Sequence, residues 1–168
     1  MSNQIFDDSN TFATGRGTVV VSGVASDAHT WNLVFLQLMI EELGYDVVNL
    51  GPCVPAELLV AECEQHKPAL VVISSVNGHG YQDGLRLIDE VRSSPELVAT
   101  PVVIGGKLGI AGDLADGAAD RLVSAGFDAV FEDGAKTVIN FYDFMAALPS
   151  AAQPVASTPL AVPAKVSV

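Results

Sequence analysis

Residues 18–32, TVVVSGVASDAHTWN, join a Val-rich run to a polar loop and to the start of a helix-like segment. The run at 18–24 is apolar without alternation, which predicts a strand buried on both faces, as in a parallel sheet. The loop at 25–31 then places Asp27 two residues before His29. A carboxylate so close to a histidine suggests a positioned imidazole. A loop aspartate that caps nearby amides, beside a solvated histidine, is the simpler alternative from this local pattern alone.

Four more apolar runs follow, and helix-like segments separate them. We expect strands over 18–24, 46–50, 69–74, 101–104 and 128–131, and helices over 32–43, 55–67, 82–93, 114–125 and 135–148. Continuous apolar strands that alternate with helices are typical of βαβ units joined by right-handed crossovers. The predicted fold class is α/β: a doubly wound, flavodoxin-like (Rossmann-like) sheet of five parallel strands in the order 2-1-3-4-5.

Composition limits the classes of partner. The chain has 168 residues, a net charge of −12 and 49% hydrophobic residues, which suits one domain with a sizeable core. The negative charge argues against nucleic acid and anionic membranes, because both attract basic patches. A negative charge would suit a basic partner, but a requirement for solubility alone also explains the charge. No apolar run approaches the roughly 20 residues of a membrane span.

We expect three segments: a flexible N-terminal arm at 1–16, one domain at 17–148, and a disordered Ala/Pro-rich tail at 149–168. The arm lacks the apolar core of a signal peptide, so we expect a cytoplasmic protein. Cys53 and Cys63 form no CxxC pair and are expected to be reduced thiols.

Two further loops should meet the first one, because the carboxyl ends of parallel strands share one edge of a sheet. Ser74 and Ser75 end the third strand, Gly78 follows in a loop, and Gly105 and Gly106 end the fourth. The hydroxyls can bond a ligand's ring nitrogen or only the local backbone. The two adjacent glycines allow a flat ligand to pack on the backbone, or form a tight turn. No GxGxxG or Walker pattern supports a dinucleotide or nucleoside triphosphate site.

His29 also lacks partners for a zinc site, because His66 and His79 belong to other predicted elements. A neutral imidazole is a good ligand for transition metals. A metal held by His29 alone would have to arrive inside a cofactor.

Taken together, these residues resemble the spaced signature DxHxxG…SxL…GG of cobalamin (B12)-binding domains. The matching segments are Asp27-Ala28-His29-Thr30-Trp31-Asn32, Ser74-Ser75-Val76 and Gly105-Gly106. The resemblance covers about residues 17–147. It is strongest to the small, free-standing cobalamin-binding subunits of glutamate mutases (methylaspartate mutases).

The resemblance implies adenosylcobalamin as cofactor, with its dimethylbenzimidazole tail detached from cobalt. His29 would then be the lower axial cobalt ligand, and Asp27 would accept a hydrogen bond from its imidazole. Ser74 would face the benzimidazole, and Gly105 with Gly106 would keep its slot open. The full set of expected cofactor-binding residues is Asp27, His29, Asn32, Ser74, Ser75, Val76, Gly78, Gly105 and Gly106.

The resemblance also implies a radical isomerase that converts L-glutamate to threo-3-methylaspartate. The substrate would bind in a separate barrel-type subunit, within a heterotetramer. This chain would carry no catalytic residue and would be inactive alone. The alternatives are a corrinoid carrier for methyl transfer or a cobalamin sensor, and a receiver-like domain without a corrin. A receiver needs a phospho-acceptor aspartate after strand 3, where Ser74 and Ser75 stand.

The sequence departs from the signature at two positions: Asn32 replaces the glycine, and Val76 replaces the leucine. Asparagine tolerates left-handed backbone and caps helices well, so we expect Asn32 to keep the turn. Its side chain adds volume where the tail would enter the slot. Valine at position 76 has a slightly smaller side chain than the leucine of the signature. Neither change removes the expected cobalt ligand, His29.

Overall fold

The computed structural model describes residues 15–110 and 117–149. The expected arm and tail therefore lie almost entirely outside the described residues. Among those residues, no helix has both the length and the apolar character that crossing a bilayer requires.

Five strands form one parallel sheet in the order β2-β1-β3-β4-β5. This confirms the predicted fold class and strand order. The strands lie close to their expected positions, with these bounds: β1 Thr18–Gly23, β2 Asp46–Gly51, β3 Leu70–Ser75, β4 Val102–Gly106 and β5 Ala129–Glu132. The clearest difference is in β4, which continues through both glycines because they pair with Ser74 and Ser75 of β3.

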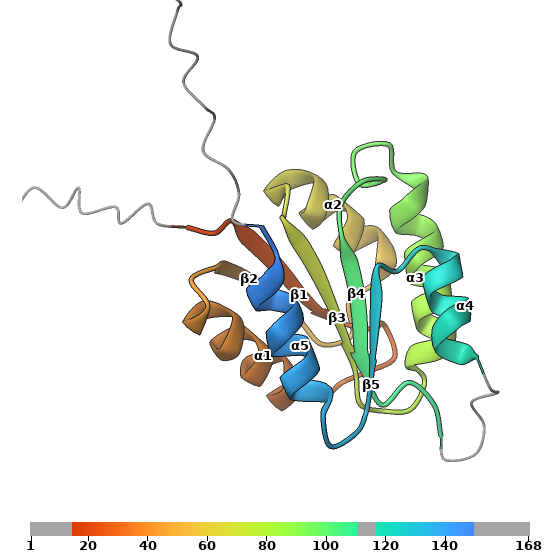
Figure 1. Cartoon of the computed structure of the whole chain (residues 1–168). Helices are drawn as coiled ribbons and strands as arrows, with labels where there is room; N and C mark the ends of the chain where they lie inside the picture. Colours follow the sequence, from red (N-terminus) through yellow and green to blue (C-terminus); the bar gives the residue numbers. More distant parts are fainter. Residues whose placement is uncertain (1–14, 111–116, 150–168) are drawn as a thin grey trace, which may run out of the picture.

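Helices cover both faces of the sheet (Figure 1). Their bounds are α1 Trp31–Glu42, α2 Ala56–His66, α3 Gly80–Ser93, α4 Ala118–Ala125 and α5 Thr137–Ala147. The helices α1 and α5 lie side by side on one face, and α2, α3 and α4 cover the other. Part of the segment expected to begin α4, at 114–116, lies outside the described residues.

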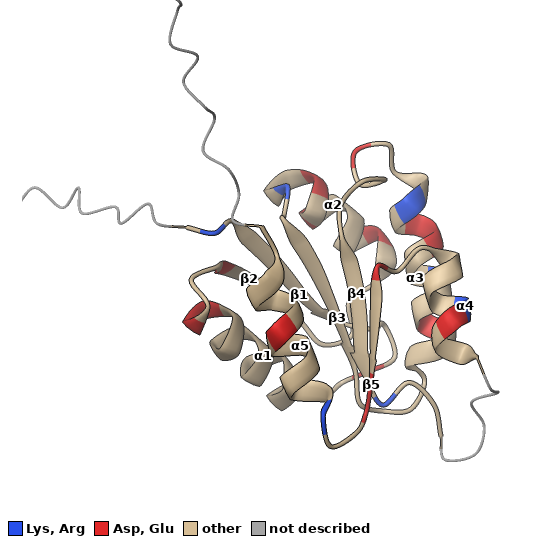
Figure 2. Cartoon of the chain, viewed as in Figure 1, with Lys and Arg blue, Asp and Glu red and all other residues tan. Residues whose placement is uncertain are grey.

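The core consists of two apolar layers, one on each face of the sheet. Successive strand residues point to opposite faces, so Val20 packs in the layer under α2 and α3 while Val19 and Val21 pack under α1 and α5. Val19, Val20 and Val21 are all fully buried, so apolar residues of β1 contribute to both layers. The three central strands, β1, β3 and β4, accordingly contain no charged residue, and the charges lie on helices, loops and the outer strands (Figure 2).

The β1–β3 pairing positions the functional loops. Gly23 pairs with Ser74, so the loop that follows β1 begins beside the loop that follows β3. The chain continues from β1 to β2 on one side and from β3 to β4 on the other, which makes this the switch point of the sheet. Ligands of doubly wound sheets bind in the crevice at this point.

Two neighbouring leucines of α2 test the packing of the core. Leu59 is fully buried, whereas Leu58 is 47% exposed. We expect Leu59→Ala to lower the free energy of unfolding by about 2–5 kcal/mol, because the cavity it leaves adds to the lost burial. Leu58→Ala should change that free energy by less than about 0.5 kcal/mol. Urea unfolding followed by far-ultraviolet circular dichroism measures both; equal losses would contradict the described packing.

Candidate functional site

The carboxylate of Asp27 is the buried centre of the site, with 1% of the residue exposed. Its Oδ1 atom accepts the backbone N–H of His29 at 3.0 Å and lies 2.6 Å from the ring atom Nδ1 of His29. Its Oδ2 atom accepts the backbone N–H of Val76 at 2.6 Å. One side chain therefore joins the loop after β1 to the loop after β3.

These contacts keep Asp27 ionised. Burial by itself opposes the charged form, but the backbone N–H groups of Val76 and His29, together with the imidazole of His29, outweigh it. The pKa of Asp27 is thus lowered below its ordinary value of 3.8. A carboxylate has only lone pairs to offer, so the ring nitrogen Nδ1 of His29 is the donor in their 2.6 Å contact.

The contact with Asp27 selects the tautomer of His29. With the proton on Nδ1, the neutral ring presents Nε2 as a lone-pair donor. The side chain of His29 is 53% exposed, so the imidazole is accessible from solvent. Within residues 15–110 and 117–149 there is no group of three or more His, Cys, Asp and Glu side chains able to hold a metal ion. The arrangement is that of a positioned imidazole, which was one of the two interpretations of the DxH pattern.

Asn77 provides a second connection between the same loops. Its Nδ2 atom donates to the backbone oxygen of Ser26 at 3.0 Å and to Ser26 Oγ at 2.9 Å. Its Oδ1 atom accepts from Ser75 Oγ at 3.1 Å. Asn77 is not among the site residues predicted from the sequence, although an asparagine in a glycine-containing loop is a common turn residue.

The loop after β2 joins the site through backbone atoms. The N–H of Cys53 donates to the carbonyl oxygen of Asp27 at 2.9 Å. Cys53 itself has a left-handed backbone, with φ of 54°.

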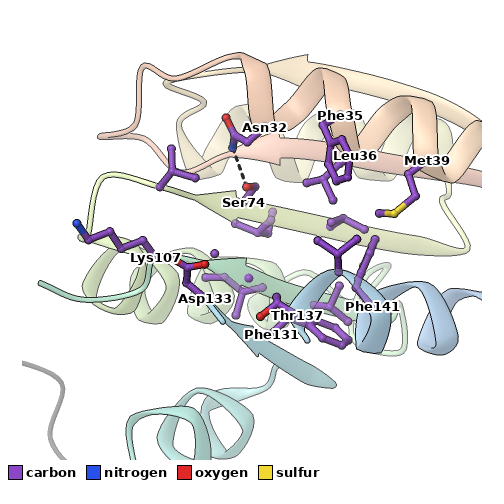
Figure 3. Close-up of a pocket in the computed structure, with 18 of the residues that line it drawn as sticks. Asn32, Phe35, Leu36, Met39, Ser74, Lys107, Phe131, Asp133, Thr137 and Phe141 are labelled. Atoms are coloured by element: carbon purple, nitrogen blue, oxygen red, sulfur yellow. Dashed lines mark hydrogen bonds between the residues drawn. The ribbon is translucent and has the colours of Figure 1, made fainter. Parts of the chain in front are cut away.

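Beside these loops, a cavity of about 410 Å³ lies between the sheet and the helices α1 and α5 (Figure 3). Its walls are mainly aliphatic and aromatic side chains from α1, β3, β4, β5 and α5, including Phe35, Leu36, Met39, Val72, Val103, Phe131, Val138 and Phe141. Ser74, Asn32 and Thr137 are among its few polar residues, and Lys107 and Asp133 carry its two charges. The resemblance predicts a slot beside Ser74, Gly105 and Gly106, but not the walls that α1, β5 and α5 contribute to it.

The expectation that Asn32 keeps a left-handed or capping turn is wrong. Thr30 occupies the N-cap position, and Asn32 is the second residue of α1. Among the described residues, only Cys53 and Lys67 are non-glycine residues with positive φ. Asn32 instead extends across to β3, where its Nδ2 atom donates to Ser74 Oγ at 2.7 Å. Its Oδ1 atom is buried and has no hydrogen-bond partner in the described part of the chain.

The residues of the SxL-like segment divide between two faces of the sheet. Ser74 borders the cavity, and so does Val76, which also supplies the N–H for Asp27. Ser75 is fully buried beside Gly80 on the opposite face, where its hydroxyl donates to Asn77. Gly78 lies in the loop after β3 with a φ of 87° and does not border the cavity.

The glycine pair borders the cavity, and the sheet itself requires both glycines. A Cβ atom on Gly106, whose φ is 97°, would lie 2.2 Å from the backbone oxygen of Ser75. A Cβ atom on Gly105 would lie 2.9 Å from the backbone oxygen of Phe131. Any side chain here would push β4 away from its neighbours.

Comparison with known proteins gives consistent matches. The family model for the B12 binding domain matches residues 17–140. The glutamate mutase sigma subunit of Halobacterium salinarum is 31% identical over 114 residues, which cover 68% of this chain and 75% of that protein. Glutamate mutase sigma subunit 2 of Haloarcula marismortui is 29% identical over 114 residues, which cover 68% of this chain and 76% of that protein.

A solved structure, the methanol:cobalamin methyltransferase complex from Methanosarcina barkeri, superposes with a TM-score of 0.59. The superposition covers 83% of this chain and 50% of that chain, at 22% identity. At this identity the likeness shows a shared fold.

The lowered pKa of Asp27 predicts a specific pH dependence. A carboxyl group whose pKa is lower in the folded state stabilises the fold above its unfolded pKa, and that contribution disappears as pH falls through the folded pKa. Asp27→Asn turns an amide N–H₂ group toward N–H donors, so we expect it to lower the free energy of unfolding by about 1–3 kcal/mol at pH 7. The deficit relative to the wild type should shrink at about pH 3.

Urea unfolding at the two pH values measures this deficit. Asp143→Asn, on the exposed surface of α5, is the matched control and should show almost no deficit at either pH. A deficit for Asp27→Asn of the same size at both pH values would contradict the assigned ionisation.

Proposed function

The chain belongs to the B12-binding domain family, and from that premise we propose that it is the cobalamin-binding subunit of a mutase of the glutamate mutase type. The observation that carries the proposal is the imidazole of His29, half exposed at the sheet edge with Nδ1 held 2.6 Å from a buried carboxylate. Curated relatives at 29% and 31% identity are named glutamate mutase sigma subunits, which supports the same assignment.

The residues present fit the two parts of a cobalamin with a detached tail. His29 offers a free imidazole nitrogen at the outer edge, where a cobalt ion inside a corrin can approach it. The cavity of about 410 Å³ beside it is lined by flat and branched apolar side chains, which suit a planar heterocyclic base. Asn32 borders this cavity, where its amide is hydrogen-bonded to Ser74 Oγ.

We assign the cofactor contacts accordingly. His29 binds the metal and Asp27 orients its ring, while Asn32, Ser74, Val76, Gly105 and Gly106 line the space for the tail. Ser75 supports the site from the opposite face of the sheet, where its hydroxyl donates to Asn77. We assign Gly78 to the turn of the loop after β3, where its φ is 87°.

When bound, adenosylcobalamin supplies radical chemistry through its cobalt–carbon bond, which side chains alone do not provide. The chain's own residues bind and orient. Asp27 keeps the proton of His29 on Nδ1 and so keeps Nε2 available, and the apolar cavity excludes water from the tail. No residue of this chain is assigned to the substrate. A barrel-type partner subunit, together with this chain in a heterotetramer, would bind L-glutamate and release threo-3-methylaspartate.

Methyl transfer is the second candidate function. A methanol:cobalamin methyltransferase complex contains the same fold, with a TM-score of 0.59. A carrier of this kind would use the same histidine and cavity and would differ in its partner and in the group on cobalt.

Magnetic resonance tests the cobalt ligand directly. We expect the electron spin resonance spectrum of bound cob(II)alamin to show axial hyperfine splitting from one protein nitrogen. The splitting should change from three lines to two when the histidines are labelled with ¹⁵N, because the nuclear spin falls from 1 to 1/2. His29→Ala should abolish this change, and cobalamin affinity should fall by more than the roughly 10–100-fold expected for Asp27→Asn.

His66→Ala is the control, because His66 lies at the end of α2 and pairs with Glu62. It should bind cobalamin as the wild type does. A spectrum unaffected by histidine labelling would reject His29 as the ligand.

Turnover distinguishes the two functions. Mixed with adenosylcobalamin and a barrel-type glutamate mutase subunit, the chain should convert L-glutamate to 3-methylaspartate, whereas each protein alone should not. Nuclear magnetic resonance of the products measures the conversion. Methyl transfer from a methylated corrinoid on this chain, without any 3-methylaspartate, would favour the second candidate.

A further inference from the structure

The contact between Asn32 and Ser74 has a defined direction. Figure 3 shows Asn32 reaching from α1 to Ser74 on β3, with 2.7 Å between Nδ2 and Oγ. Both residues are buried, with 6% and 5% exposed. An amide N–H₂ group donates and does not accept. Ser74 Oγ is therefore the acceptor, and the proton of its hydroxyl has to point elsewhere.

The cavity is the place left for that proton. Ser74 Oγ makes no other hydrogen bond to a described residue, and Ser74 borders the cavity. The surrounding wall is largely apolar, with Val76 and Phe131 among its members. A buried donor in such surroundings is satisfied best by an acceptor on whatever occupies the cavity.

Asn32 holds this arrangement at a cost to the protein. Its Oδ1 atom is buried and unpartnered within the described ranges, and a buried acceptor without a donor destabilises the fold. The B12-binding signature has glycine at this position, which would carry no such cost. A polar residue that breaks a packing rule beside a ligand cavity indicates a role in the contact that it does make.

We propose that Asn32 is a positioning residue that fixes the Ser74 hydroxyl as a donor into the cavity, so that the site selects cobamides whose base carries an unprotonated ring nitrogen. The inference rests on the proposed function, because it takes the cavity occupant to be the base of a cobamide. Dimethylbenzimidazole detached from cobalt offers such a nitrogen. A phenolic base, bonded to ribose through oxygen, offers none.

Two cofactors and one isosteric substitution test this. Dissociation constants are measured for adenosylcobalamin and for its p-cresolyl analogue, and their ratio is compared between variants. Detachment of dimethylbenzimidazole from cobalt affects this ratio equally in every variant, so a change in the ratio reports the cavity. In Asn32→Asp the carboxylate accepts the Ser74 proton, at nearly unchanged volume, and withdraws the donor from the ligand.

We expect the preference for adenosylcobalamin to fall about threefold to tenfold in Asn32→Asp, the range of one net hydrogen bond. Ser74→Ala should lower it by a similar factor. The double variant should lower it no further, because both changes remove the same donor. Ser94→Ala, a buried serine that bonds Glu64 away from the cavity, is the control and should keep the wild-type ratio.

Each other outcome is decisive. An unchanged or increased preference in Asn32→Asp, or additive effects in the double variant, would overturn the role of Asn32 while leaving the proposed function intact. If the wild type binds neither cobamide, both the proposed function and the inference fail. If Asn32→Asp does not fold, Asn32→Ala replaces it: a smaller loss of preference supports the inference, and no loss overturns it.

Discussion

The buried carboxylate of Asp27 is the interaction that holds the ligand-facing edge of this protein together. It binds the N–H of Val76 from the loop after β3 and both the N–H and the ring of His29 in its own loop. Its backbone oxygen accepts the N–H of Cys53 from the loop after β2. Three loops thus converge on one residue, and the ionised form is required because all the side chain's partners are donors.

The glycine pair of β4 shows how one residue type can serve the sheet and the site together. Gly106 has no room for a side chain because β3 lies against it, and β5 excludes one at Gly105. The same absence of side chains opens the wall of the cavity. Packing alone would require glycine here, so glycine at these positions is weaker support for ligand binding than the contacts of Asp27 or Ser74.

Parts of the site were predictable because they are local in sequence. Asp27 and His29 are two residues apart, and a short turn is enough to bring their side chains together. Ser74 and Ser75 are adjacent, and strand alternation places one at the cavity and the other toward α3. The sequence does not tell which of the two serines faces the cavity. The role of Val76 was not predictable from its side chain, because its backbone N–H makes the contact.

The sequence by itself determined the class of the fold, the strand order and the candidate imidazole. Uncharged strands between helices can be buried only in a sheet covered on both faces, and parallel strands bring their carboxyl ends to one edge. The tertiary structure alone decided which elements wall the cavity and which residue Asn32 contacts. The cavity exists because α1 and α5, about 100 residues apart, lie side by side over the same strands. Asn32 meets Ser74 only across that packing, and long-range contacts of this kind leave no local pattern in the sequence.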